Sequence, residues 1–476
     1  MAVLAIDQGT SGTKAIVVDD DGAVLAISEQ PVYPRYLADG GVEHDPQVLL
    51  ASVLDTGRDA VMQANCAIDA VSLANQGETV LAWDPGTGET LSPAIVWQDR
   101  RAESVCDTLT AHREGIRART GLELDSYFSA PKMRWLRDQV GAGGVITTSD
   151  TWLVHALTGE FVTDRTTAGR SLITDLRTTD WDRELLALFG LADEPLPTIV
   201  DNDAIIGTTA AFGPPAPVAG LVVDQQAALL AQGCLQPGTA KCTFGTGAFL
   251  LANVGQQPTL STRGLAACVG WRLRSQTTYC FDGQAYTAGS AVRWLQNLGV
   301  IAQPADLDEL AVADAGGVLF VPALAGLAAP WWRPDARASF VGMGLSTGRG
   351  ELVTAVLEGL AAQTVEVIAA MQADIAQPLD RLRVDGGLTR SRRLMQAVAD
   401  IGQIPVDVYP SPHATALGAA ACARLSIDPT LSITDAVPPW SPAATYEPRW
   451  DSDRANDFRT RWHAAATSTL PQKDMP

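Results

Sequence analysis

A glycine- and hydroxyl-rich turn between two apolar runs, within residues 3–19, constrains the fold of this chain more than any other feature. The first apolar run ends at Asp7, the turn contains Gly9 and Gly12, and a second apolar run starts at Ala15. This pattern predicts a β-hairpin whose glycines let backbone N–H groups approach a phosphate closely. Asp7, at the end of the first strand, is placed to face a hydrated Mg²⁺.

A second segment, residues 240–253, repeats the order of an apolar run, Gly-Thr-Gly and another apolar run. Taken alone, each segment is as compatible with an ordinary hairpin turn as with a phosphate site. Two such hairpins about half a chain apart predict two related domains that hold one nucleotide between them. We therefore expect an N-terminal domain over residues 1–215 and a C-terminal domain over 219–476, with the proline-rich segment 212–218 as their connector.

Composition narrows the partners and the setting of the chain. It has 476 residues, enough for two large domains, and a formal net charge of −20, which argues against nucleic acid or an anionic membrane as the main partner. The seven cysteines include no Cys-x-x-Cys pair, so neither a zinc site nor a disulfide framework is indicated. The sequence enters a strand at once, and we expect neither a cleavable leader nor an apolar run of about 20 residues that could span a membrane. A reduced cytoplasmic setting follows from these features.

Further motifs identify a family resemblance that covers residues 3–425. Residues 127–139 fit the first signature of the FGGY carbohydrate kinases, and residues 338–343 followed by 351–358 fit the second. The order and spacing of four more segments are similar to those of the glycerol kinases within that family, namely residues 41–46, 94–98, 150–152 and 224–226. The resemblance implies an α/β, two-domain fold of the actin/hexokinase-like (ribonuclease H-like) type, with ATP and the acceptor in the cleft between the domains.

The activity that this resemblance implies is ATP- and Mg²⁺-dependent phosphorylation of a primary hydroxyl of glycerol or a closely related small polyol. Such a transfer needs positioning, charge neutralisation and an acceptor for the hydroxyl proton. Asp224 is the expected general base, which orients the hydroxyl and takes its proton late. The structural alternative for Asp224 is a helix N-cap, because it ends a predicted strand and precedes a predicted helix.

The resemblance also assigns binding residues. Asp7 is expected to hold Mg²⁺. The acceptor is expected to contact carboxylate, amide and aromatic groups, which suit the hydroxyls and the C–H face of a polyol: Gly77, Glu78, Trp97, Tyr127, Asp224, Gln225 and Tyr286. The nucleotide is expected to contact the two hairpins and a third glycine turn: Thr10, Ser11, Lys14, Gly245, Thr246, Gly247, Gly289, Arg293, Gly387, Leu388 and Ser391.

Three positions depart from the glycerol kinase pattern. Gly77 stands where those enzymes carry an arginine that donates to glycerol hydroxyls, Tyr286 stands where they usually carry phenylalanine, and Lys14 replaces an arginine. Loss of a charged donor to a buried hydroxyl weakens binding roughly ten- to a hundredfold. Gly77 also opens volume that a longer polyol could fill. The loop at 210–217 lacks the Gly-Arg segment through which some glycerol kinases bind fructose 1,6-bisphosphate, so that feedback is not expected.

The sequence is compatible with alternatives. Within the class, the chain is compatible with a kinase of a four- or five-carbon polyol or ketose, such as erythritol, threitol, xylitol or xylulose. Outside it, the same fold could serve as an ATP-driven switch, although Trp97 and residues 224–226 disfavour this. Relatives often form dimers or tetramers, so a homodimer or homotetramer is expected.

Overall fold

The first β-hairpin lies near the middle of a six-stranded mixed sheet. The computed structural model describes residues 1–375 and 378–469, so the last residues of the expected C-terminal domain, 470–476, lie outside the described chain. Strand β1 pairs antiparallel with β2 and parallel with β6, which confirms the predicted hairpin. The strand order of this first sheet is β12 (Ile205–Thr209), β13 (Ala216–Val223), β6 (Ala70–Asn75), β1 (Val3–Gln8), β2 (Gly12–Val18) and β3 (Val24–Pro31).

Alternate side chains of β1 pack against helices on opposite faces of the first sheet. Leu4 and Ile6 share a core with residues of α1 (Pro46–Ala64), whereas Val3 and Ala5 share one with residues of α13 (Ala414–Ile427). The start of α1 follows from its sequence, since the Asp45 carboxylate accepts from the Gln47 amide at 2.9 Å and proline occupies the first turn. The sheet is therefore covered on both faces, one of them by a helix from late in the chain.

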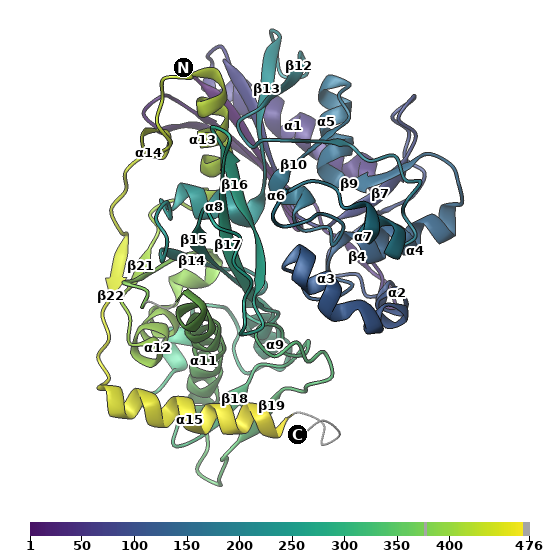
Figure 1. Cartoon of the computed structure of the whole chain (residues 1–476). Helices are drawn as coiled ribbons and strands as arrows, with labels where there is room; N and C mark the ends of the chain where they lie inside the picture. Colours follow the sequence, from purple (N-terminus) through teal and green to yellow (C-terminus); the bar gives the residue numbers. More distant parts are fainter. Residues whose placement is uncertain (376–377, 470–476) are drawn as a thin grey trace.

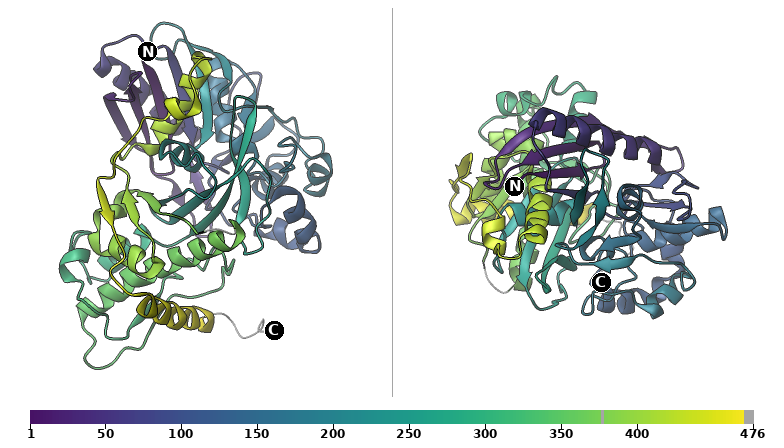
Figure 2. Two further views of the ribbon diagram at one scale, coloured as in Figure 1. Left: turned by 60° about the vertical axis from the view of Figure 1, so that its left-hand side comes forward. Right: turned by 90° about the horizontal axis from the view of Figure 1, so that it is seen from above.

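Helix α13 approaches its neighbour very closely. A Cβ atom at Gly418 would lie 1.9 Å from the Ala227 carbonyl oxygen of α8 (Asp224–Ala231), so only glycine fits at this crossing. The small residues of this helix therefore serve close packing. Figures 1 and 2 show α13, in yellow-green, beside the purple strands of the N-terminal sheet. The position of α8, whose first residue is Asp224, is thereby fixed between the two halves of the molecule.

The second hairpin is confirmed within a seven-stranded mixed sheet. Strands β14 and β15 pair antiparallel around the Gly-Thr-Gly turn, and β14 pairs parallel with β20. The order of this second sheet is β16 (Ala266–Leu273), β17 (Gln276–Ala285), β15 (Ala248–Gly255), β14 (Ala240–Phe244), β20 (Leu382–Asp385), β21 (Val406–Val408) and β22 (Ala444–Tyr446). Both sheets thus pair a hairpin with a parallel strand, as expected for two related domains.

The remaining elements complete the two halves (Figure 1). A five-stranded sheet beside the first half consists of β4 (Arg35–Tyr36), β5 (Val42–His44), β8 (Ala94–Ile95), β7 (Val80–Trp83) and β9 (Val145–Thr148). Two-stranded sheets are formed by β10 (Val162–Asp164) with β11 (Thr198–Val200), and by β18 (Leu319–Val321) with β19 (Ser339–Val341). The helices of the first half are α2 (Glu103–Thr108), η1 (Thr110–His112), α3 (Arg113–Thr120), α4 (Ser129–Val140), α5 (Ser149–Thr158), α6 (Arg165–Ala168) and α7 (Arg183–Leu188). The second half has α9 (Gly289–Asn297), α10 (Asp306–Leu310), α11 (Arg349–Ile375), η2 (Gly387–Arg390), α12 (Arg392–Gly402), α14 (Ile433–Ala436) and α15 (Ser452–Ser468).

The proline-rich segment 212–218 is not a connector. Its last residues belong to β13, which pairs parallel with β6 inside the first sheet, and Phe212 is buried against α1, where a Cβ at Gly57 would meet its ring at 2.3 Å. Proline is tolerated here because Pro217 stands near the start of β13, before the pairing with β6 begins at Val218. Asp224 therefore follows the last strand of the first sheet directly.

Helix α11 corrects a second expectation, that no stretch is long and apolar enough to cross a membrane. Its 27 residues meet that criterion by length and composition, but 78% of the most apolar window is buried inside the protein. Such burial is typical of the core helix of a large domain.

Glu358 of α11 provides a test of stability against pH. Burial, together with the negative charge of Asp314, raises the pKa of Glu358 from 4.5 to about 7. Between these values the folded protein retains a proton that the unfolded chain has released, so stability falls as pH rises from 4.5 to 7 and stays lower above. Glu358→Gln is therefore expected to raise the free energy of unfolding at pH 8 by on the order of 2 kcal/mol. Urea denaturation at pH 5.5 and pH 8 measures this. The control is Glu114→Gln at an exposed position, which should leave the free energy of unfolding unchanged at both pH values.

Candidate active site

The first hairpin carries Asp7 and Thr10 toward the middle of the molecule. The Gly9 amide donates to the Gly12 carbonyl at 3.0 Å, which closes the turn. The Thr10 hydroxyl accepts from the Trp97 indole N–H at 2.9 Å, so the predicted phosphate turn contacts the predicted acceptor wall directly. Lys14 is the register partner of Asp7, but its ammonium pairs with Glu29 at 2.7 Å. The structure thus places the Lys14 side chain beside Asp7 and already engaged by another carboxylate.

The second hairpin is held by the start of α9. The Gly289 amide donates to the Gly245 carbonyl at 2.9 Å, and the Ser290 amide donates to the Thr246 carbonyl at 3.1 Å. A Cβ atom at Gly289 would lie 2.6 Å from the Gly245 oxygen, and one at Gly247 would lie 2.5 Å from the Ala285 oxygen. Only glycine fits at these two positions, which explains the glycine pattern found in the sequence.

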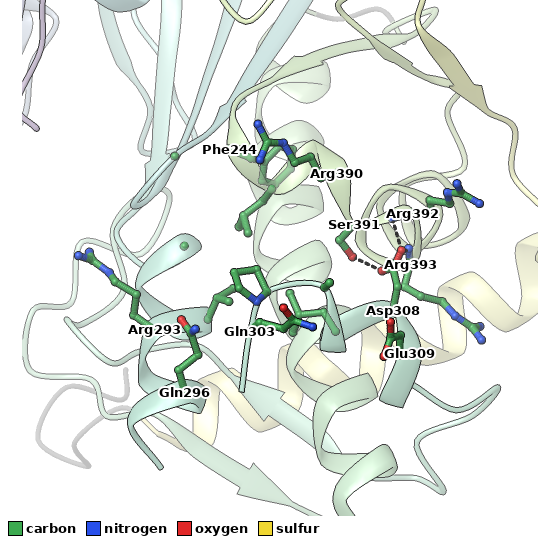
Figure 3. Close-up of a pocket in the computed structure, with 18 of the residues that line it drawn as sticks. Phe244, Arg293, Gln296, Gln303, Asp308, Glu309, Arg390, Ser391, Arg392 and Arg393 are labelled. Atoms are coloured by element: carbon green, nitrogen blue, oxygen red, sulfur yellow. Dashed lines mark hydrogen bonds between the residues drawn. The ribbon is translucent and has the colours of Figure 1, made fainter. Parts of the chain in front are cut away.

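A cavity of about 1120 Å³ opens beside this hairpin (Figure 3). Of the predicted nucleotide set beyond the first hairpin, Gly247 does not line it, whereas seven residues do: Gly245, Thr246, Gly289, Arg293, Gly387, Leu388 and Ser391. The next turn closes one side, since Gly386 has φ +94° and a Cβ there would meet the Phe244 oxygen at 2.4 Å. The sequence reasoning missed α10 and the 303–305 loop, whose residues line the opposite wall, because nothing local marks them as neighbours of the hairpin.

Ser391 lines this cavity but its hydroxyl is already engaged. It donates to Asp308 at 2.6 Å and accepts from the Leu394 amide at 3.2 Å, which caps α12. Ser391→Ala is expected to lower the free energy of unfolding by about 1 kcal/mol through loss of the cap. The KM for ATP should change little, because the hydroxyl has its partners without a nucleotide. Thermal unfolding and ATP titration measure both; a raised KM at unchanged stability would instead place the hydroxyl on the nucleotide.

Three carboxylates lie close enough to interact: those of Asp7 in the first hairpin, Asp224 at the start of α8 and Asp385 at the end of β20. Burial, followed by the negative charge of Asp224, raises the pKa of Asp7 to about 7, and burial also raises the pKa values of Asp224 and Asp385. Lys241 opposes both of the latter shifts. Its buried ammonium donates to the Gln225 side-chain oxygen and, at 2.9 Å, to the Thr243 hydroxyl. Sequence reasoning missed Lys241 as a member of the site, because a lone lysine in an apolar strand gives no signal.

Asp224 is not an N-cap. The cap of α8 is Val223, and Asp224 is the first helical residue, where one carboxylate oxygen accepts from the Gln225 amide at 2.6 Å. In the part of the chain that the structure describes, the second oxygen accepts no backbone hydrogen bond, and the Gln225 side chain also interacts with the carboxylate. That oxygen is available to a hydroxyl group in the cleft.

Aromatic rings form a wall beside Asp224. The Trp97 ring lies 5.5 Å from that of Tyr127 and 5.9 Å from that of Phe249, centroid to centroid, both edge to face. Glu78 is buried next to this wall and adopts φ +60°, an uncommon conformation for a residue other than glycine. Such local strain often accompanies a functional site. Six predicted acceptor residues, Gly77, Glu78, Trp97, Tyr127, Asp224 and Gln225, thus surround one region between the two sheets.

The turn that carries Tyr127 is held from below by Lys132. The buried ammonium donates to the carbonyls of Ser126, Tyr127 and Phe128 at 2.9, 2.5 and 2.6 Å. Burial lowers the pKa of Lys132 to about 7, although Glu78 opposes this shift.

Tyr286 directly follows β17, where burial and the charge of Asp125 raise its pKa above the ordinary value. Its hydroxyl therefore stays protonated and can donate a hydrogen bond.

The expected open volume at Gly77 is partly filled. A Cβ atom there would lie 3.5 Å from Val223 and 3.8 Å from the Cδ atom of Arg170, in ordinary contact with both. Arg170 is buried and pairs with Glu78 and, at 2.6 Å, with Asp282. Sequence reasoning missed this arginine, which comes from the segment after α6 and not from the 75–79 motif.

The donor set suits Mg²⁺. In the described parts of the chain there is no group of three or more histidine, cysteine or acidic side chains arranged as a metal cage. Mg²⁺ is usually held by one or two carboxylates with substrate phosphates and water, and the oxygens at the junction of the hairpins fit that requirement.

The comparisons with known proteins agree with this geometry. Residues 2–231 match the N-terminal domain of the FGGY family of carbohydrate kinases, and residues 240–427 match the C-terminal domain of the same family. The chain belongs to the FGGY family of carbohydrate kinases. The predicted two-domain α/β kinase fold and the predicted class of enzyme, an ATP- and Mg²⁺-dependent kinase of small carbohydrates or polyols, are confirmed.

This FGGY kinase is similar to its relatives over nearly its whole length. It is 42% identical to the glycerol kinase of Aromatoleum aromaticum, over 97% of each chain, and 44% identical to that of Alkalilimnicola ehrlichii, over 90% of each. Among solved structures, that of Plasmodium falciparum glycerol kinase with ADP superposes with a TM-score of 0.91 at 32% identity, over 99% of this chain and 98% of that one.

Proposed function

We propose that this kinase transfers the γ-phosphoryl group of ATP to a primary hydroxyl of glycerol or a closely related small polyol. The observation that carries the proposal is the position of Asp224, with one available carboxylate oxygen, between the two hairpins and the wall of Trp97 and Tyr127. The printed names of the relatives that match over nearly the full length, glycerol kinases, support the choice of acceptor.

Asp224 acts as the general base in this proposal. Its free oxygen accepts a hydrogen bond from the hydroxyl group of the polyol and orients that group toward the phosphoryl group. It takes the proton late, since an alcohol is a far weaker acid than a carboxylic acid. The ammonium of Lys241 supports the ionised form of Asp224, against the burial that disfavours it. The carboxylate is thus kept basic enough to take a proton and charged enough to orient the hydroxyl.

The two hairpins hold the phosphates from opposite sides. The Gly245 amide closes the turn by donating to the Gly247 carbonyl at 2.9 Å, so the backbone N–H groups at Thr246 and Gly247 supply the donors from one side. Those around Thr10 and Ser11 supply them from the other. Asp7 would hold Mg²⁺, which neutralises charge on the transferring phosphate when it is bound. The cavity between α9, α10 and the turn at Gly387 would hold the adenosine.

Three further features stay predictions. We propose two domains, with the boundary after β13. The expected boundary at residues 215–219 falls inside or just before this strand, which is the last strand of the first sheet. A homodimer or homotetramer is expected from the resemblance, and size-exclusion chromatography with light scattering would measure it. A cytoplasmic setting is expected from the composition.

An acceptor panel tests the proposed function. Acceptor-dependent ADP release with Mg-ATP is measured for glycerol, erythritol, D- and L-threitol, xylitol, ribitol, dihydroxyacetone and xylulose. Glycerol is expected to give the highest kcat/KM. A four- or five-carbon polyol or a ketose in first place would favour the alternative that Gly77 and Tyr286 suggest, and ATP hydrolysis that no acceptor stimulates would favour an ATP-driven switch.

A further inference from the structure

Arg170 contacts two residues of the proposed acceptor pocket, although no sequence motif marks it. It is 3% exposed and follows α6. Its Nε donates to Glu78, its Nη1 donates to Asp282 at 2.6 Å, and its Nη2 lies 3.5 Å from the Tyr127 hydroxyl. Two of these three partners, Glu78 and Tyr127, are the proposed acceptor residues themselves.

The position of Arg170 is related to the glycine at 77. Its Cδ atom lies 3.8 Å from where a Cβ of residue 77 would stand, so its stem passes beside the space that Gly77 leaves. A guanidinium group therefore reaches the pocket from residue 170, while residue 77 supplies none. Guanidinium carries five N–H donors in a planar fork, and the described residues leave one Nη2 hydrogen for a ligand.

We propose that Arg170 binds the acceptor and sets its size, supplying the cationic donor that residue 77 lacks. The proposal deepens the proposed function and rests on it. A hydroxyl group both accepts and donates, so a vicinal diol can take a hydrogen bond from Nη2 and give one to Glu78. An acyclic polyol with at least two adjacent hydroxyls beyond the reacting one fits this arrangement.

Strand β17 supplies further polar groups on the same side. Asp282 Oδ1 and both amide atoms of Gln284 are buried without a hydrogen-bond partner in the described chain. Residues two apart on a strand share a face, and the register partner of Gln284 is Phe249, whose ring contacts Trp97. Buried polar groups need partners, and hydroxyls of an acceptor would provide them.

A purely structural role makes a different prediction. Glu78 precedes β7 and Asp282 lies on β17 of the second sheet, so Arg170 also links the two halves. If this link is its whole contribution, replacement would lower stability and affect ATP and acceptor alike. If Arg170 binds the acceptor, the loss is concentrated in acceptor binding.

The experiment compares Arg170→Met and Arg170→Lys with Arg137→Met in the full chain. Arg137 is the matched control, because this arginine of helix α4 also pairs with a buried carboxylate, that of Glu194, at 2.6 Å, and contacts none of the predicted acceptor residues among the hydrogen bonds and ion pairs of the described chain. Glycerol binding without ATP is followed by tryptophan fluorescence, and kcat and both KM values are measured with the acceptor that the wild type uses best. For Arg170→Met we expect the Kd and KM for the acceptor to rise roughly ten- to a hundredfold, with a nearly unchanged KM for ATP. Arg170→Lys should lie between, and Arg137→Met should lose stability alone.

A rescue variant separates binding from structure, even if Arg170→Met is poorly folded. A Cβ atom at residue 77 meets only ordinary contacts, so Gly77→Arg is combined with Arg170→Met to return a guanidinium to the pocket. We expect it to recover most of the acceptor affinity. Equal losses for ATP and acceptor without rescue would overturn the proposal in favour of a structural link. If no polyol stimulates ADP release by the wild type, the proposed function is overturned instead, and the acceptor panel measures this separately.

Discussion

Replacing Asp224 with asparagine is expected to lower kcat by roughly 10²–10⁴-fold, the usual contribution of a positioned general base. The amide can still contact the hydroxyl but cannot take its proton. The KM for ATP should stay close to that of the wild type, because Asp224 faces the acceptor side of the hairpins. Steady-state kinetics with saturating acceptor and Mg-ATP measures kcat, and ADP release without acceptor measures the background.

The matched control is Asp451→Asn. Asp451 also stands at the start of a helix, where its carboxylate accepts from the Arg454 amide at 2.8 Å, but it lies far from both hairpins. It should lose a little stability and keep its kcat. If Asp224→Asn is likewise less stable but fully active, Asp224 serves only the start of its helix and is not the general base.

The parts of the fold that the sequence predicted are those with local signals. Both hairpins follow from apolar runs around glycine turns, and the start of α1 follows from Asp45 and Pro46. Strand β13 was misread because its pairing with β6 joins residues about 150 positions apart, and a short proline-rich approach resembles a linker. Local patterns carry no information about which distant strand accepts a segment.

The sequence predicted the site residues that lie inside motifs and missed those that lie outside them. Residues inside motifs, such as Asp7, Glu78 and Asp224, lie together as expected. Arg170 and Lys241 were missed because each acquires its role through partners far away in sequence. Arg170 reaches Asp282 across 112 positions, and Lys241 stands beside Asp385. The open volume inferred at Gly77 was incomplete for this reason, since only the folded chain brings Arg170 beside it.

Asp7→Asn is expected to separate activity from stability. The carboxylate of Asp7 is held near Asp224 and Asp385, and burial with this repulsion raises its pKa to about 7. At pH 8 the ionised group therefore destabilises the protein relative to the unfolded chain, in which its pKa is 3.8, and the neutral amide removes that cost. Without Mg²⁺ we expect a higher melting temperature than that of the wild type.

Activity should change in the opposite direction. Loss of the carboxylate removes an oxygen donor suited to Mg²⁺, and kcat/KM for Mg-ATP is expected to fall by roughly ten- to a hundredfold, with partial recovery at high Mg²⁺. Asp19→Asn is the control: Asp19 accepts from the Ala23 amide at 2.8 Å in the next turn, so its replacement should cost stability and leave activity intact. If Asp7→Asn instead loses stability and activity together, Asp7 serves the turn and not the metal. A protein that becomes more stable as it loses activity would show that the three clustered carboxylates are retained for catalysis at the expense of the fold.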